Sequence, residues 1–273
     1  KNIIWEIWNE PNLEKFWGEP PNPDNYMVLL RKTVKAIRKA DPNSLIIAPA
    51  VCGCDIGFMK KCIDKGLLEF VDAVSLHPYR EGGPETVLEC YAKLKNLIED
   101  NLPKNERRIG IVSSEWGWGL SYLGLKDTGR DRAELKQAEY LTRRFCIEAY
   151  AGIKCAVYYK WRENNHGLVR NNYSLKPSYT AFTILNEQLS GYCNDVTRLD
   201  IGDSKTVFVF LFKGKDHSKI VAWRAEGTER VSIPIRGNII KAVDFLGNSV
   251  RLSAKGKFVN VELSEKPIFI HIE

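Results

Sequence analysis

Two glutamates follow apolar, strand-like runs and have the chemistry needed to cleave an acetal. Glu10 lies in residues 5–12 (WEIWNEPN), and Glu115 lies in residues 111–118 (IVSSEWGW). Splitting an acetal C–O bond at neutral pH requires one carboxylic acid that protonates the leaving oxygen and a second carboxylate that attacks or screens the anomeric carbon. If the two runs end at the same edge of a sheet, these glutamates supply both groups.

The elements that must position these glutamates repeat a strand-then-helix unit. Hydrophobic periodicity predicts strands at residues 3–8, 45–51, 71–76, 108–114 and 154–161. The helices that follow them are predicted at residues 25–39, 58–70, 85–101, 132–151 and 178–189, with Asp131 as the cap of the fourth. This alternation is typical of an α/β fold with a parallel sheet.

The pattern changes after Thr206 to short alternating strands separated by turn signals. Strands are predicted at residues 206–212, 219–224, 231–235, 239–245, 250–253, 257–263 and 267–272. Their spacing indicates a small antiparallel β-sandwich. We therefore predict two domains, residues 1–192 and residues 193–273, and we interpret the second as a structural cap because its aromatic residues alternate as core residues do.

The two glutamate motifs together resemble the superfamily of retaining (β/α)8 glycoside hydrolases, and WEIWNEPN is similar to its β-xylosidase/α-iduronidase-like and cellulase-like branches. In that superfamily the Asn-Glu-Pro motif ends the fourth barrel strand and the second motif ends the seventh. The resemblance thus implies an incomplete (β/α)8 TIM barrel, strands four to eight, followed by the sandwich. Nothing here corresponds to the Arg of the second strand or the polar residues of the third.

The same resemblance implies roles for individual residues. Glu10 becomes the general acid and base, Glu115 the nucleophile, and Asn9 a ligand of the sugar hydroxyl next to the anomeric carbon. His77 and Tyr79, in residues 75–79 (SLHPY), are expected to bind the nucleophile or the sugar.

Aromatic residues complete the implied site: Trp116 and Trp118 as sugar-stacking rings, and Trp161 as the floor under the cleaved sugar. Each role has a structural alternative. Glu115 could form a buried ion pair, His77 could be a satisfied core residue, and Trp161 could serve barrel packing.

Two classes of function remain open. The first is a retaining glycoside hydrolase acting on a β-linked sugar. The second is a carbohydrate-binding or scaffold protein with a truncated barrel and weak or no turnover. An open five-stranded parallel sheet leaves unpaired edges, so we expect a further segment, a partner chain or a homo-oligomer to cover them.

Composition narrows the partners. The formal net charge of +6 is scattered along the predicted helices, which argues against nucleic acid, and no apolar run reaches the length of a membrane span. The seven cysteines are an odd number on predicted strands and apolar helix faces, so we interpret them as buried free thiols of a reducing, cytoplasmic compartment. Cys52, Cys54 and Cys62 lack the second half of a metal-binding pattern, and we expect neither metal nor cofactor.

Overall fold

The computed structural model describes residues 3–102, 108–192 and 195–273. The chain forms two compact units. The first contains Lys1–Arg80, Thr86–Trp116 and Ile153–Tyr159, and the second contains Glu81–Glu85, Gly117–Gly152 and Lys160–Glu273. The domain boundary predicted after residue 192 falls on residues outside the described ranges and stays a prediction.

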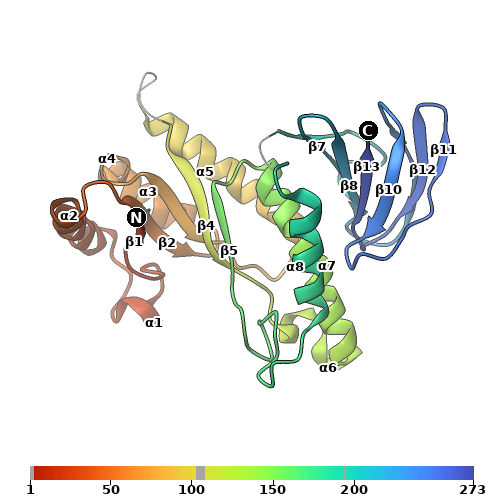
Figure 1. Cartoon of the computed structure of the whole chain (residues 1–273). Coiled ribbons are helices and arrows are strands. Elements are labelled where there is room, and N and C mark those ends of the chain that lie inside the picture. Colours follow the sequence, from red (N-terminus) through yellow and green to blue (C-terminus); the bar gives the residue numbers. More distant parts are fainter. Residues whose placement is uncertain (1–2, 103–107, 193–194) are drawn as a thin grey trace. The chain divides into compact units, whose positions relative to one another are not determined.

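The first unit is built on a five-stranded parallel sheet whose strands are neighbours in chain order, as Figure 1 shows. The strands are β1 (Ile4–Glu6), β2 (Leu45–Cys52), β3 (Ala73–His77), β4 (Gly110–Trp116) and β5 (Cys155–Tyr158). The predicted order of five strands is therefore confirmed. Strand β1 is shorter than predicted, because the backbone turns to a left-handed conformation at Trp8, with φ of 70°.

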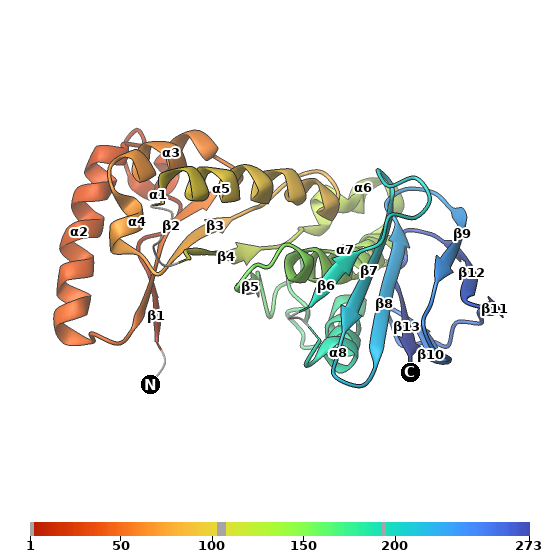
Figure 2. The same ribbon diagram turned by 90° about the horizontal axis from the view of Figure 1, so that it is seen from above.

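Helices of the first unit lie on one side of this sheet (Figure 2). They are α1 (Glu14–Trp17), α2 (Pro23–Ala40), α3 (Ile56–Asp64), α4 (Leu67–Phe70) and α5 (Val87–Asn101). The single helix predicted over residues 58–70 is wrong: it is two helices, because Gly66 between them has a left-handed φ of 89°. Helix α3 begins two residues earlier than predicted, where the side chain of Asp55 accepts a hydrogen bond from the Phe58 amide.

The central strands are buried over most of their length, as expected for a covered parallel sheet. Ile47, Ala73 and Val112 form a cluster across three neighbouring strands. In the register, Cys52 lies opposite His77. Because the strands are parallel, their carboxyl ends gather at one edge of the sheet, where Glu10, His77 and Glu115 lie.

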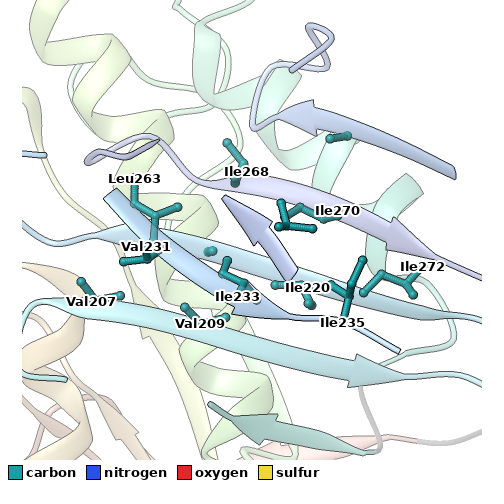
Figure 3. Close-up of a cluster of buried hydrophobic side chains, with 13 residues drawn as sticks. Val207, Val209, Ile220, Val231, Ile233, Ile235, Leu263, Ile268, Ile270 and Ile272 are labelled. Carbon is teal, nitrogen blue, oxygen red and sulfur yellow. The ribbon is translucent and has the colours of Figure 1, made fainter. Parts of the chain in front are cut away.

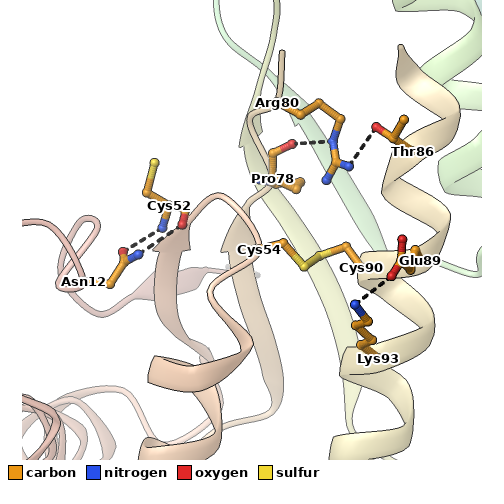
Figure 4. Close-up of a disulfide and its surroundings, with 9 residues drawn as sticks. All are labelled: Asn12, Cys52, Cys54, Pro78, Arg80, Thr86, Glu89, Cys90 and Lys93. Carbon is orange, nitrogen blue, oxygen red and sulfur yellow. Dashed lines mark hydrogen bonds and ion pairs between the residues drawn. A yellow bond between two sulfur atoms is a disulfide. The ribbon is translucent and has the colours of Figure 1, made fainter. Parts of the chain in front are cut away.

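A disulfide joins Cys54, just after β2, to Cys90 on α5 (Figure 4). The prediction of free thiols is wrong for this pair. The two cysteines are 36 residues apart in the sequence, but the fold brings their Cα atoms to 5.9 Å from each other. Cys62 and Cys146 are buried free thiols, Cys52 is half-buried and Cys155 is exposed, while Cys193 lies outside the described residues. The thiol argument for a reducing compartment therefore loses its basis.

The second unit contains η2 (Leu120–Leu123), α6 (Leu125–Thr128), α7 (Arg130–Tyr150) and α8 (Pro177–Leu189). Helix α7 begins at Arg130 after Gly129, so the predicted cap at Asp131 is wrong. Asp131 lies instead in the first turn of the helix, where its negative charge interacts favourably with the positive end of the helix dipole.

Two antiparallel sheets form the C-terminal part of the second unit. One has the order β10-β13-β8-β7-β6 and the other the order β11-β12-β9. The strands are β6 (Val196–Arg198), β7 (Val207–Lys213), β8 (Ser218–Arg224), β9 (Glu229–Pro234), β10 (Ile239–Asp244), β11 (Ser253–Lys255), β12 (Phe258–Leu263) and β13 (Ile268–Ile272). Aliphatic side chains from both sheets form one buried cluster (Figure 3).

Two details of these sheets differ from the prediction. The strand expected at residues 250–253 is wrong, because the pairing strand β11 starts at Ser253 and turns at Gly256 into β12. Strand β6 was not predicted, since three residues are too few for an alternating pattern. Among the described residues, none of the helices combines the length and apolarity of a membrane span.

Candidate active site

Three predicted residues meet at the carboxyl ends of the parallel strands in the first unit. Glu10 follows β1, His77 is the last residue of β3, and Glu115 lies near the end of β4. One carboxylate oxygen of Glu10, one of Glu115 and one ring nitrogen of His77 all lie within 4.8 Å of one another. The glutamates, 105 positions apart in the sequence, thus share one site.

The backbone that presents Glu10 is unusual for residues other than glycine. Trp8, Glu10 and Ala50 have φ values of 70°, 46° and 57°. Such conformations cost about 1–3 kcal/mol each and are kept where the surroundings hold them. Here the amide of Glu10 donates to the carbonyl of Ala50 at 3.1 Å. The side chain of Asn12 also bonds both backbone groups of Cys52, at 3.1 and 2.8 Å.

His77 is hydrogen-bonded to Glu10 rather than to Glu115. Its Nδ1 lies 3.0 Å from Oε1 of Glu10, and the two residues are 2% and 5% exposed. Its Nε2 lies 3.8 Å from Oε2 of Glu6. Burial lowers the pKa of His77, but the hydrogen bond to Glu10 and the nearby charge of Glu6 outweigh it and raise the pKa to about 9. The ring is therefore an imidazolium at neutral pH.

Tyr79 provides the contact to Glu115. Its hydroxyl donates to Oε1 of Glu115 at 2.8 Å. Burial and the neighbouring Glu115 raise the pKa of Tyr79 far above its usual range, so the phenol stays protonated and remains a donor. Of His77 and Tyr79, which were both expected to bind Glu115 or the sugar, Tyr79 is hydrogen-bonded to Glu115.

Cys52, at the end of β2, is a neighbour of Glu10 that sequence analysis did not assign to the site. Burial and the adjacent Glu10 raise the pKa of its thiol to about 12, so it is a neutral donor. The amide of Gly53 donates to the carbonyl of His77 at 2.8 Å, which ties this strand end to β3. A cysteine just after a predicted strand gave no signal of such a position.

Glu6 is the second residue that sequence analysis missed. It ends β1 and points its carboxylate at the ring of His77. The available signal was a charged residue in an otherwise apolar strand, four positions before Glu10.

The predicted aromatic residues divide into buried and exposed. Trp116 and Trp118 are only 1% and 3% exposed, with edges against Tyr158 and Tyr140. Both rings are buried among neighbouring side chains in this chain, and their expected role as sugar-stacking rings stays a prediction. Trp161, in the second unit, is 60% exposed. Asn9 is exposed beside Glu10.

The cluster of Glu10, His77 and Glu115 has atoms of the kinds that bind metal ions. A metal ligand, however, must be a neutral imidazole with a free ring nitrogen. Nδ1 of His77 is engaged with Glu10. The arrangement therefore suits proton transfer between carboxylates and an imidazole better than ion binding.

Comparison with known proteins identifies the class to which this site belongs. The family model for cellulase (glycosyl hydrolase family 5) matches residues 1–164 of the 273-residue chain. The chain belongs to this family.

Individual relatives are other glycoside hydrolases. A β-xylosidase of Geobacillus stearothermophilus is 34% identical over 85 residues, which are 30% of this chain and 16% of that protein. A family 39 glycoside hydrolase from the gut symbiont Bacteroides cellulosilyticus WH2 has a TM-score of 0.79 and 22% identity over 98% of this chain and 58% of its own. AbfB, a family 51 α-L-arabinofuranosidase from Bifidobacterium longum, has a TM-score of 0.75 and 12% identity over 99% of this chain and 67% of its own. The chain thus spans only part of these relatives.

Proposed function

We propose that this chain carries the catalytic pair of a retaining glycoside hydrolase that acts on a β-linked sugar, as part of a barrel whose strands four to eight are β1 to β5. The observation that carries the proposal is the distance of at most 4.8 Å between carboxylate oxygens of Glu10 and Glu115. Retaining enzymes place their carboxyl groups about 5–5.5 Å apart, whereas inverting enzymes need about 6.5–9.5 Å to admit a water molecule.

In the first step Glu115 attacks the anomeric carbon while Glu10 gives its proton to the glycosidic oxygen. The C–O bond to the leaving group breaks, and an ester between the sugar and Glu115 forms. Tyr79 donates to one oxygen of Glu115, which orients the carboxylate and leaves the other oxygen to attack.

In the second step Glu10 acts as the base. It takes a proton from water, the resulting hydroxide attacks the anomeric carbon, and the ester to Glu115 breaks. Both displacements occur at the same carbon, so the product keeps the configuration of the substrate.

The substrate proposal starts from exposed groups and from the names of relatives. Asn9 lies exposed beside Glu10 and has an amide that can bond a sugar hydroxyl, and Trp161 offers an exposed ring face. Because one relative is named a β-xylosidase and another an α-L-arabinofuranosidase, we propose a pentoside as the substrate, with a β-xyloside as the first to test.

The two outer strands of the parallel sheet have exposed apolar residues, which favours pairing with further polypeptide. Ile4 and Trp5 on β1 and Val157 on β5 are exposed apolar residues on the two outer strands. An uncovered apolar edge strand favours association. We infer that further polypeptide, a second copy or another chain, pairs with these strands, and the mass of the purified chain in solution will distinguish a monomer from an oligomer.

The test is a panel of aryl glycosides assayed with Glu10→Gln, Glu115→Gln and the control Glu14→Gln, which changes an exposed residue of α1. We expect Glu115→Gln to abolish turnover of every aryl glycoside. Glu10→Gln should reduce it by about 10²–10⁴-fold for a poor leaving group and by less for dinitrophenol, which needs no protonation. The control should match the wild type.

A second class of function gives a different result in the same panel. A carbohydrate-binding or scaffold protein would bind the sugars without hydrolysis, and its affinity would not change in either glutamate variant. That outcome would overturn the proposed enzyme.

A further inference from the structure

The carboxylates of Glu6, on β1, and Glu10, in the loop after β1, lie beside the two different nitrogens of the His77 ring. Glu10 lies 3.0 Å from Nδ1, and Glu6 lies 3.8 Å from Nε2. The spacing of four residues between Glu6 and Glu10 spans the left-handed backbone at Trp8. The result is a carboxylate–imidazole–carboxylate row at the carboxyl end of the sheet.

Glu6 has the properties of an anion inside this row. Burial raises its pKa, but the neighbouring imidazole of His77 and the nearby hydroxyls of Ser114 and Ser75 outweigh that effect, and the net pKa is lowered. Its side chain is 27% exposed and that of His77 only 2%. The charge of Glu6 therefore acts on a buried ring with little screening by solvent.

We propose that Glu6 is a positioning residue for the acid/base glutamate and that it acts through His77, where its anion keeps a proton on the His77–Glu10 pair. This inference rests on the function proposed above. Glu6 does not touch the reacting atoms in this scheme. It fixes the ring of His77 and stabilises the positive charge on it.

The proton moves along a simple route. It can pass from Nδ1 of His77 to Oε1 of Glu10 across their hydrogen bond, and from Glu10 to the leaving oxygen. In the second step Glu10 takes a proton from water and the pair is restored. Because the pair has the same total charge wherever the proton sits, a nearby anion stabilises the proton on either partner.

The charged and titratable groups around His77 determine how the pKa of the His77–Glu10 pair should change when the charge of Glu6 is removed. Glu6 and Glu10 face the ring from β1 and its loop, and Glu115 faces it from β4. Cys52 of β2 and Tyr79 after β3 are held neutral by their raised pKa values. Removing the charge of Glu6 leaves less negative charge near the pair, so the pair loses its last proton at a lower pH.

The experiment is the pH dependence of kcat/KM for the wild type and Glu6→Gln on an aryl β-xyloside with a poor leaving group. We expect the alkaline limb to move down by about one pH unit, so that kcat/KM changes little at neutral pH and falls by up to about tenfold above the wild-type limb. The matched control is Asp72→Asn. Asp72 is another partly buried carboxylate of the first unit, and it pairs with Arg38 and the Ile46 amide. This control should lower stability without moving either limb.

A second readout does not depend on activity. The chain has four histidines, and imidazole ¹⁵N signals followed against pH will give the titration of His77, identified by its disappearance in His77→Gln. We expect Glu6→Gln to lower this titration by about one pH unit.

The possible failures are distinguishable. An active wild type whose alkaline limb and His77 titration are the same in Glu6→Gln would overturn the inference alone. A folded wild type that hydrolyses none of the glycosides would overturn the proposed function, and the role of Glu6 with it.

Discussion

Carboxylates in the two compact units differ in how many hydrogen bonds their oxygens make to neighbouring side chains. In the second unit, Glu85 receives two hydrogen bonds of 2.7 Å from the guanidinium of Arg143, one to each oxygen, and a third of 2.7 Å from the indole of Trp223. In the first unit, Glu10 and Glu115 each have one short bond, to a titratable ring and a phenol. A carboxylate held on both oxygens by a guanidinium is a structural ion pair, whereas a singly held one keeps bonding capacity for substrate.

The largest expected effect is the loss of stability when the ion pair between Glu85 and Arg143 in the second unit is broken. Glu85→Gln leaves the buried guanidinium of Arg143 without its counter-charge, and we expect the free energy of unfolding to fall by about 3–5 kcal/mol. Urea unfolding followed by circular dichroism measures it. Glu115→Gln should show the opposite pattern, with stability nearly unchanged and turnover lost.

This comparison fails if Glu85→Gln is as stable as the wild type. It also fails if Glu115→Gln unfolds as readily as Glu85→Gln, because the first-unit glutamate would then be the structural one.

The next effect concerns the disulfide between β2 and α5, which closes a loop behind the candidate site. Cys90→Ser should lower the free energy of unfolding by about 2–4 kcal/mol, because the unfolded chain gains conformational freedom. Cys54→Ser should do the same, and Cys155→Ser, which changes an exposed free thiol, should have little effect. Equal stability of all three variants would show that no such disulfide exists in solution.

The smallest effect is the loss of the phenol bonded to Glu115. Tyr79→Phe removes one hydrogen bond to a charged group, worth about 1.5–3 kcal/mol. We expect kcat/KM to fall by about ten- to a hundredfold, with the free energy of unfolding little changed. Steady-state kinetics will check this, and Tyr122→Phe, at an exposed site, is the control. A Tyr79→Phe variant with full activity would contradict the assigned role.

The parallel sheet could be predicted from sequence because each strand is a continuous apolar run followed by a helical period. Boundaries were less certain where single backbone angles decide them. The left-handed φ of Trp8 ends β1 early, and Gly66 divides the helix predicted over residues 58–70. Neither feature changes the hydrophobic pattern on which the prediction depends.

The candidate site was predictable in its members but not in its pairings. Glu10 and Glu115 followed from strand ends and His77 and Tyr79 from the resemblance to a known superfamily, yet which donor meets which glutamate depends on side-chain direction. The part played by Glu6, the burial of Trp116 and the bond between Cys54 and Cys90 all depend on contacts between distant segments. Spacing along the chain contains no information about such contacts.

The most direct test of the catalytic pair is to trap its covalent intermediate. A 2,4-dinitrophenyl 2-deoxy-2-fluoro-β-xyloside forms the sugar ester readily, because its leaving group needs no acid, and hydrolyses slowly, because fluorine destabilises the oxocarbenium-like transition state. We predict that mass spectrometry of the digested protein will find one added fluorosugar on Glu115, and none in Glu115→Gln. A stable adduct on any other residue, or rapid turnover to a product of inverted configuration, would contradict the account.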